Sequence, residues 1–189
     1  MSASEAAIFF KLWVRKPLGL AAANPSGAAL ADAVAAQLDF SRPGAVVELG
    51  AGTGGITQGL LRIGCAPDRL VIIEREPELS AVLRRRFPAS RVVTGDATRL
   101  ETLLRPLGLD RVASVVSTLP IKWFPRAAQA AVAHQSLDLV GPEGQFLQMT
   151  NAVVSPLPLR ALGLEGRTVA RVWWNFLPAQ IWSYRRATA

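Results

Sequence analysis

The stretch Val46-Val47-Glu48-Leu49-Gly50-Ala51-Gly52-Thr53-Gly54-Gly55-Ile56-Thr57 decides the fold. Apolar residues lead into four glycines within six positions, and a segment with apolar residues at helical spacing follows. This order predicts a strand, a tight turn and a helix. Glycines in the turn let a ligand approach the backbone, and the first turn of the helix offers it free N–H groups. The stretch therefore predicts a ligand site at the end of the first strand.

Two classes of ligand fit this turn. Three of its glycines match the dinucleotide pattern G-x-G-x-x-G, and Glu74 follows about where that pattern wants an acid. Glu48 favours the other class, because its carboxylate would repel a pyrophosphate and attract a ligand that carries an ammonium and a sulfonium group. S-adenosylmethionine (SAM) is such a ligand. Residues 48–54 resemble the first motif of the class I SAM-dependent methyltransferases.

Length and composition limit the alternatives. A chain of 189 residues, half of them hydrophobic, predicts one well-buried domain and is too short for a dehydrogenase with a second nucleotide-binding half and a substrate domain. The net charge of +7 indicates an anionic partner, either nucleic acid or an acidic membrane surface. Cys65, the single cysteine, excludes an internal disulfide and a thiolate metal site; no metal is expected, and a cytoplasmic setting fits.

The N-terminal residues predict contact with a membrane rather than a crossing of it. The chain has no signal-peptide layout and no apolar run long enough to span a bilayer. In a helix over residues 4–14, aromatic side chains would share one face and cations another, which is typical of an interfacial helix. A lid helix packed on the domain's own surface is the alternative. The residues expected at the membrane are Phe9, Phe10, Lys11, Trp13 and Arg15.

From residue 44 onward, strand-like and helix-like segments alternate, which predicts a parallel sheet with helices on both faces. Two strand-like runs at the end of the chain, joined by a turn with Pro178, predict an antiparallel hairpin. The expected fold is an α/β, Rossmann-like class I methyltransferase fold with a seven-stranded mixed sheet. Residues 1–40 are expected to form a helical extension, and residues 41–189 the methyltransferase domain. The expected strands are 46–49, 70–73, 91–94, 112–116, 144–150, 168–176 and 180–185.

Acidic residues follow the second and third expected strands. Glu74 ends the second, where a carboxylate can accept hydrogen bonds from both ribose hydroxyls of a nucleoside. Asp96 follows the third, at the place where class I methyltransferases have an acid that reads the adenine amino group. Asp96 can equally cap a helix over residues 98–104, and the two roles are compatible.

The fourth expected strand opens into Ser117-Thr118-Leu119-Pro120-Ile121-Lys122-Trp123-Phe124. Enzymes that methylate the amine of adenine resemble one another in an Asn-or-Asp, Pro, aromatic loop here, which holds the NH₂ group and stacks on the base. Ser117 stands in place of the Asn and Ile121 in place of the aromatic residue, although Trp123 or Phe124 could stack instead. An aliphatic amine requires less, namely position and a sink for its proton. Beyond this loop, the proline-rich residues 153–164 are a candidate lip around an apolar substrate.

Four segments together indicate a narrower family: Phe9-Phe10-Lys11-Leu12-Trp13 before Asn24-Pro25-Ser26, residues 48–57, Ser117-Thr118-Leu119-Pro120, and Asn175-Phe176-Leu177-Pro178-Ala179-Gln180-Ile181-Trp182. With them, nearly the whole chain resembles the bacterial phospholipid N-methyltransferases of the Rhodobacter type. These small enzymes use SAM to convert phosphatidylethanolamine stepwise to phosphatidylcholine.

The resemblance implies SAM as cofactor and S-adenosylhomocysteine as product. By it, the residues that hold SAM would be Glu48, Gly50, Ala51, Gly52, Thr53, Glu74, Asp96, Ala97 and Ser117. Ser117, Leu119 and Pro120 would line the gate for methyl transfer. By position alone, the candidates to hold the lipid phosphate are Lys122, Arg171 and Arg185.

The expected partners are phosphatidylethanolamine, its methylated derivatives and an anionic membrane, met by a monomer at the cytoplasmic face of the inner membrane. The alternative is an RNA adenine N6-methyltransferase related to the rRNA dimethylases, favoured by the charge of +7. The loop residues noted above and an extra helical domain for RNA are lacking, so nucleic acid is disfavoured as a partner. A SAM-binding adaptor without turnover is disfavoured by the full set of cofactor acids. His134, the single histidine, is expected to be structural.

Overall fold

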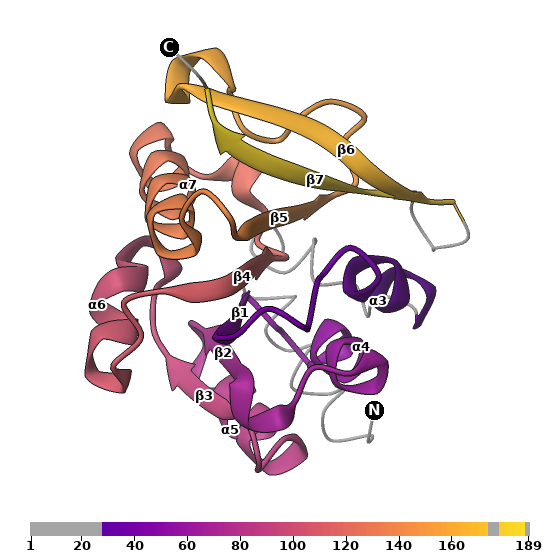
Figure 1. Cartoon of the computed structure of the whole chain (residues 1–189), viewed down its shortest axis with the longest axis vertical. Coiled ribbons are helices and arrows are strands. Elements are labelled where there is room, and N and C mark those ends of the chain that lie inside the picture. Colours follow the sequence, from indigo (N-terminus) through magenta and orange to yellow (C-terminus); the bar gives the residue numbers. More distant parts are fainter. Residues whose placement is uncertain (1–27, 174–177, 188–189) are drawn as a thin grey trace.

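The computed structural model of the protein describes residues 28–173 and 178–187. The strands within these residues are β1 (Ala45–Leu49), β2 (Leu70–Glu74), β3 (Arg91–Thr94), β4 (Val112–Ser117), β5 (Gln145–Thr150), β6 (Leu164–Val172) and β7 (Ala179–Arg186). They form one mixed sheet in the order β3-β2-β1-β4-β5-β7-β6 (Figure 1). Strands β1 to β5 are parallel, and β7 is antiparallel to both β5 and β6. The predicted seven-stranded sheet with a C-terminal hairpin is confirmed.

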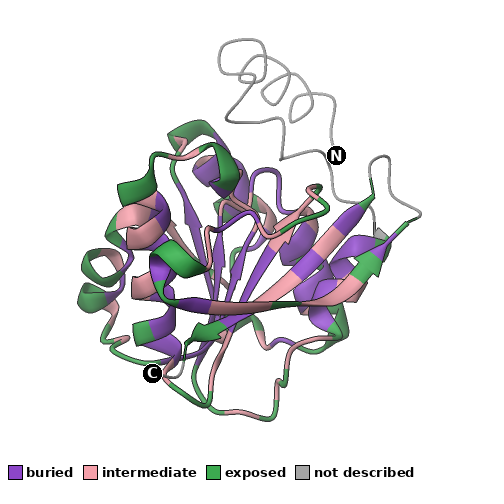
Figure 2. Ribbon diagram, turned by 90° about the horizontal axis from the view of Figure 1, so that it is seen from above, coloured by how far each residue is buried: buried purple, intermediate pink, exposed green. Residues whose placement is uncertain are grey.

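Helices cover both faces of the sheet. Those on one face are α3 (Ala28–Ala35), α4 (Gly55–Ile63) and α5 (Pro77–Arg86), and those on the other are α6 (Leu100–Leu104) and α7 (Arg126–Val140) (Figure 1). Successive strand residues alternate between the two faces, so that Val46 packs with the first group and Val47 with the second. Because both faces are covered, β1 and β2 are buried along their whole length, as Figure 2 shows for the centre of the sheet.

Short 3₁₀ turns complete the described elements: η1 (Pro67–Arg69), η2 (Ala97–Arg99), η3 (Arg105–Leu107), η4 (Ile121–Trp123) and η5 (Arg160–Leu162). The helix predicted over residues 98–104 is divided into η2 and α6. The sixth strand begins at Leu164, four residues before the predicted start, because Leu164 is buried in the core beside Tyr184. In the proline-rich residues 153–164, Leu157 and Leu162 are buried in the same cluster, so this segment closes the core.

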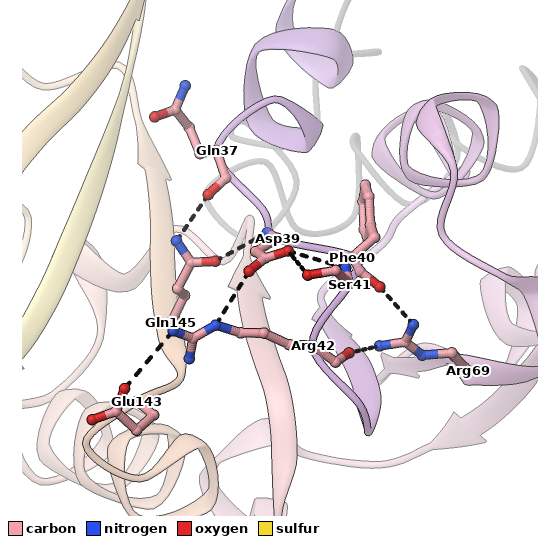
Figure 3. A network of polar contacts seen from close by, with 8 residues as sticks. All are labelled: Gln37, Asp39, Phe40, Ser41, Arg42, Arg69, Glu143 and Gln145. Atoms are coloured by element: carbon pink, nitrogen blue, oxygen red, sulfur yellow. Dashed lines mark hydrogen bonds and ion pairs between the residues drawn. The ribbon is translucent and has the colours of Figure 1, made fainter.

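A polar network fixes the segment between α3 and β1 at the amino edge of the sheet (Figure 3). Gln145 at the start of β5 donates to the carbonyl of Gln37 at 2.8 Å and accepts from the backbone N–H of Asp39 at 3.4 Å. From the other side, Arg69 donates to the carbonyl of Phe40 at 2.8 Å. This network holds the chain at the edge of the sheet opposite to the carboxyl ends of the parallel strands, where the pocket described below lies.

The predicted amphipathic helix, with Phe9, Phe10, Lys11, Trp13 and Arg15, lies outside the described residues. Within residues 28–173 and 178–187, no helix has both the length and the apolar character needed to cross a bilayer.

Candidate active site

The loop between β1 and α4 is built on left-handed glycines. Gly50, Gly52 and Gly54 have φ angles of 75°, 58° and 86°, which residues with a side chain adopt only with strain. Gly54 is also the residue before the first turn of α4. The loop therefore brings backbone to the carboxyl edge of the sheet at a helix N-terminus, where N–H groups lack partners within the helix.

The loop after β4 rests directly on Gly50. The side chain of Thr118 donates to the carbonyl of Gly50 at 2.5 Å, and its backbone N–H donates to the carbonyl of Leu49 at 3.0 Å. A Cβ atom placed on Gly50 would lie 2.7 Å from Cδ2 of Leu119, which is closer than two carbon atoms approach. Gly50 thus provides the space that Leu119 fills.

Glu74 joins the end of β2 to the glycine loop. Its buried carboxylate accepts hydrogen bonds from the backbone N–H of Gly52 at 2.9 Å and of Glu76 at 3.0 Å. A carboxylate has about four lone-pair sites, so it keeps capacity for further donors such as hydroxyls. Burial raises the pKa of Glu74, and these backbone hydrogen bonds oppose the rise.

Glu48 lies beneath the loop, on the α4 side of the sheet, and is fully buried. One carboxylate oxygen accepts from the hydroxyl of Thr57 at 2.6 Å, and the other, Oε1, has no hydrogen-bond partner among the described residues. Burial, with a smaller contribution from the nearby Glu74, raises the pKa of Glu48 to about 7, and the Thr57 hydrogen bonds oppose this rise. Near neutral pH this carboxyl group is therefore balanced between its neutral and charged forms.

A pocket of about 280 Å³ opens at the carboxyl edge, close to the size at which small-molecule sites begin, about 300 Å³. The ends of β1, β2 and β3 contribute Gly50, Ile73, Glu74, Arg75, Glu76, Gly95, Asp96, Ala97 and Thr98. The loop after β4 and the start of α7 contribute Thr118, Leu119, Pro120, Phe124, Pro125 and Ala128. One wall is thus acidic and the other mostly apolar.

Six of the predicted site residues meet at this pocket: Gly50, Glu74, Asp96, Ala97, Leu119 and Pro120. Asp96 caps η2, since its carboxylate accepts from the N–H of Thr98 at 2.9 Å, while the residue stays exposed at the pocket wall. The predicted capping role is therefore present at a position that also faces the pocket.

Other predicted residues lie behind the wall or away from it. Glu48, Ala51, Gly52, Thr53 and Ser117 do not line the pocket; the Ser117 hydroxyl is fully buried and accepts from the N–H of Leu119 at 3.4 Å.

The three candidate phosphate ligands are split between the two edges of the sheet. Lys122 and Arg171 lie at the carboxyl edge, after β4 and near the end of β6. The structure does not bring Arg185 to this edge: it lies near the opposite end of β7 and donates to Glu165 at 2.8 Å.

Two buried glutamines hold the loop after β4, and sequence reasoning did not single them out. Gln148 on β5 donates to the carbonyl of Leu119 at 2.9 Å, and Gln129 on α7 donates to the carbonyls of Lys122 and Phe124 at 3.3 and 3.0 Å. The sequence offered a signal for Gln148, which is a polar residue among apolar residues of β5 and pairs with Ser117 of β4. Both side chains fix main-chain carbonyls, so they set the shape of the pocket wall.

The replacement Gln148→Leu is expected to destabilise the fold by about 1–3 kcal/mol, because it removes the donor to buried carbonyls with little change in volume. The urea dependence of unfolding measures this loss. Gln58→Leu on the exposed face of α4 is the matched control and should change stability by less than about 0.5 kcal/mol. An equal effect of the two replacements would mean that the hydrogen bonds to the loop contribute nothing.

His134 lies apart from this site, where its Nε2 atom is 3.0 Å from the carbonyl oxygen of Leu162. No group of three or more His, Cys, Asp and Glu side chains within residues 28–173 and 178–187 is arranged to hold a metal ion.

The strand order, the glycine loop after β1 and the acids after β2 and β3 together define a class I SAM-dependent methyltransferase fold. Solved structures agree. A TehB-like SAM-dependent methyltransferase from Corynebacterium glutamicum superposes with a TM-score of 0.63 at 15% identity, over 98% of this chain and 100% of that one. The glycopeptide N-methyltransferase MtfA complexed with SAM gives 0.61 at 16%, over 85% and 94%.

A third structure, the 1,6-didemethyltoxoflavin-N1-methyltransferase of Burkholderia thailandensis with bound S-adenosylhomocysteine, gives 0.62 at 20% identity, over 86% of this chain and 79% of that one. These low identities show the fold alone. Two of these neighbours were crystallised with a ligand, MtfA with SAM and the toxoflavin enzyme with S-adenosylhomocysteine.

Sequence comparison gives the family. No family model matches the chain. The ornithine lipid N-methyltransferase of Singulisphaera acidiphila is 32% identical over 148 residues, which cover 76% of each chain. The protein belongs to the same family as this lipid N-methyltransferase.

Proposed function

We propose that the protein transfers methyl groups from SAM to the amine of phosphatidylethanolamine, stepwise toward phosphatidylcholine. The observation that supports this most is its membership of a family that includes a lipid N-methyltransferase. We further propose that it works as a monomer at the cytoplasmic face of the inner membrane. Of the expected extension over residues 1–40, the part before α3 would bind the membrane, since α3 itself packs in the core of the methyltransferase domain.

Two observations fit SAM, one at the pocket and one behind its wall. Gly50 has no side chain at the point where backbone, Leu119 and pocket meet, so a ligand can approach the loop closely. The unpartnered oxygen of the buried Glu48 carboxylate fits a cationic ligand held beside the same loop. When bound, SAM supplies an electrophilic methyl group on its sulfonium.

Each acid has a proposed role in holding the cofactor. Glu74 would accept hydrogen bonds from the ribose hydroxyls, while Asp96 and Ala97 would lie beside the adenine. Glu48 would attract the cationic cofactor through its charge, from beneath the glycine loop. Gly52 and Thr53 would keep this loop in the conformation that holds the cofactor.

The apolar wall supports an aliphatic amine as the acceptor. Opposite the acids, Leu119, Pro120 and Phe124 line the pocket, with no amide or carboxylate side chain in this loop to hold the weakly nucleophilic amine of a base. A lipid amine needs only to lose its proton, to water or to a nearby carboxylate, and to be held in line with the methyl group. Lys122 and Arg171 are the proposed cations for the lipid phosphate.

Transfer of label from SAM to competing acceptors tests the proposal. Vesicles of phosphatidylethanolamine, vesicles of ornithine lipid, and structured RNA would be offered in parallel to the purified protein. The expected result is label in phosphatidylethanolamine. Label in ornithine lipid alone would contradict phosphatidylethanolamine as the acceptor and favour ornithine lipid. Label in RNA alone would favour the alternative, adenine methylation.

The affinity for SAM is expected to depend on pH through Glu48. Its pKa is raised by burial from 4.5 to about 7, and only the ionised form attracts a cation. Affinity should therefore rise with pH by up to about tenfold per unit below 7 and level off above it. The stability of the ligand-free protein should change in the opposite sense. Because the folded protein binds the Glu48 proton more tightly than the unfolded chain does, stability that is present below pH 4.5 is lost as the pH rises toward 7.

Calorimetric titration with SAM across this pH range checks the expectation, with Glu48→Gln as the control. Glu74, whose pKa is raised as well, titrates in both proteins, so the difference between the two profiles reports on Glu48. Identical profiles would show that Glu48 does not sense the ligand.

A further inference from the structure

Large apolar side chains are exposed around the apolar side of the pocket. Trp123 is 69% exposed, Val153 81%, Val154 66% and Trp173 66%. Trp123 follows β4, the two valines follow β5, and Trp173 follows β6. Because β6 runs parallel to β5 on the far side of β7, all three strands end at the carboxyl edge. The other large exposed apolar residue of the described part is Ile63, 40% exposed, at the end of α4 and hence at the opposite edge.

These side chains belong to neighbouring loops. The amide of Asn151 donates to the carbonyl of Pro178 at 2.9 Å, and Gln180 donates to the carbonyl of Val153 at 3.4 Å, so the loop after β5 is tied to the start of β7. Trp123 lies on the same loop as the pocket residues Leu119 and Phe124. The apolar surface thus begins at the pocket.

The charged residues of the carboxyl edge are divided between two halves, with cations on the apolar half and acids on the other. Around the ends of β4, β5 and β6, residues 117–126, 150–158, 171–173 and 178–180 contain Lys122, Arg126 and Arg171, all exposed, and no acidic residue. Around the ends of β2 and β3, the pocket is lined by Glu74, Glu76 and Asp96, and the one cation among its lining residues, Arg75, pairs with Glu76 at 3.6 Å. One half of the edge suits a cationic cofactor, and the other presents cations and apolar side chains to an anionic partner.

We infer that Trp123, Val153, Val154 and Trp173, with Lys122 and Arg171, form a docking rim that inserts into an anionic lipid surface. The inference rests on the proposed lipid methylation and adds the surface by which the domain itself meets the bilayer, separate from the predicted helix over residues 4–14. Tryptophan is a side chain that suits the boundary between head groups and acyl chains, and nearby cations gain from anionic lipid. With the rim inserted, the pocket opens at the level of the lipid head groups.

Charge and chemistry favour lipid over the other occupants of such a surface. Valines after β5 offer nothing to a base or a phosphate, which an RNA site would need. Residues 1–27 of the chain itself could cover the rim, and the experiment below separates that arrangement from membrane docking.

The test is sedimentation of the full-length protein with phosphatidylcholine vesicles that contain phosphatidylglycerol. Trp123→Ser with Trp173→Ser removes the aromatic part of the rim, and Lys122→Glu with Arg171→Glu reverses its charge. Since each well-placed cation strengthens binding about fivefold, the charge reversal should weaken it at least about 25-fold. The matched controls are Ile63→Ser, exposed and apolar at the opposite edge, and Arg85→Glu, exposed on α5, and both should bind vesicles as the wild type does.

A second readout needs no turnover. Lipids brominated in their acyl chains should quench the tryptophan fluorescence of the wild type, and quench it less in Trp123→Phe with Trp173→Phe. A wild type that methylates no lipid but docks through the rim would overturn the proposed function and leave this inference standing.

Three results would overturn the inference instead. The first is vesicle binding that is absent in the wild type or unchanged in the rim variants. The second is a loss of thermal stability in the serine variant beyond that of Ile63→Ser with vesicle binding retained, which would place residues 1–27 on the rim. The third is a wild type that binds structured RNA while the rim variants lose this binding and still bind vesicles.

Discussion

Replacing Gly50 by alanine is expected to lower kcat/KM for SAM by at least about 100-fold while the protein stays folded, since a shift of about 1 Å in a positioned group costs a factor of this size. The new Cβ atom would lie 2.7 Å from Cδ2 of Leu119 and 3.5 Å from the hydroxyl of Thr118. The leucine is flexible and must move away from the glycine loop, into the pocket that it lines. The place where the loop after β4 meets the proposed cofactor would then be distorted.

Gly108→Ala separates this effect from backbone strain. Gly108 has a φ of 68°, close to the 75° of Gly50, and no atom lies within 4 Å of a Cβ built on it. Both replacements carry the left-handed strain of about 1–2 kcal/mol, so thermal unfolding should show a loss in both, and the contact with Leu119 adds to the loss in Gly50→Ala. Steady-state kinetics with SAM should separate them. Equal catalytic losses would contradict the assignment of Gly50 to the site.

Glu74→Ala is expected to weaken SAM binding by about 100-fold, which corresponds to about 2–3 kcal/mol. A loss of this size is typical when hydrogen bonds to a buried charged group are removed. The replacement removes the proposed acceptor for the ribose hydroxyls. It also strips the buried N–H groups of Gly52 and Glu76 of the carboxylate that accepts from them at 2.9 and 3.0 Å. The glycine loop should therefore lose its shape together with its ligand contact.

Equilibrium titration with SAM measures this loss, and Glu74→Gln divides it. Glutamine keeps one oxygen for a backbone donor but turns an NH₂ group toward the other, so its affinity should lie between those of the wild type and the alanine variant. Glu78→Ala, on the exposed start of α5, is the control and should bind as the wild type does. Unchanged affinity in Glu74→Ala would remove this residue from the cofactor site.

The sequence was sufficient for the order of the elements because local signals and tertiary packing agree in this chain. Glycines at residues 50–55 predicted a turn between a buried strand and a helix, and α4 begins at Gly55 as this pattern indicates. Strands buried on both faces are largely apolar runs: β2 is apolar up to Glu74 at its end, and Glu48 is the one polar residue of β1. The early start of β6 was missed because Gly166 and Arg167 interrupt the apolar pattern, while pairing with β7 decides the strand.

The site was predictable where a residue type follows a strand end, as for Glu74 and Asp96. It was not predictable where side chains act on main-chain groups far away in sequence. Gln148 reaches Leu119 across 29 residues, and only the pairing of β4 with β5 brings them together. The position of Arg185 was not predictable either, because β7 is antiparallel and therefore places this cation at the edge of the sheet away from the pocket.

Methylation of phosphatidylethanolamine is tested most directly by mass spectrometry of anionic vesicles that contain this lipid, after incubation with SAM and either the wild type or Gly50→Ala. We expect phosphatidylethanolamine to gain methyl groups in the wild-type sample, in an amount equal to the S-adenosylhomocysteine formed, and to gain them at least about 100-fold more slowly with Gly50→Ala. Phosphatidylethanolamine that stays unmodified with the wild-type protein, while SAM is bound or another acceptor is methylated, would contradict it.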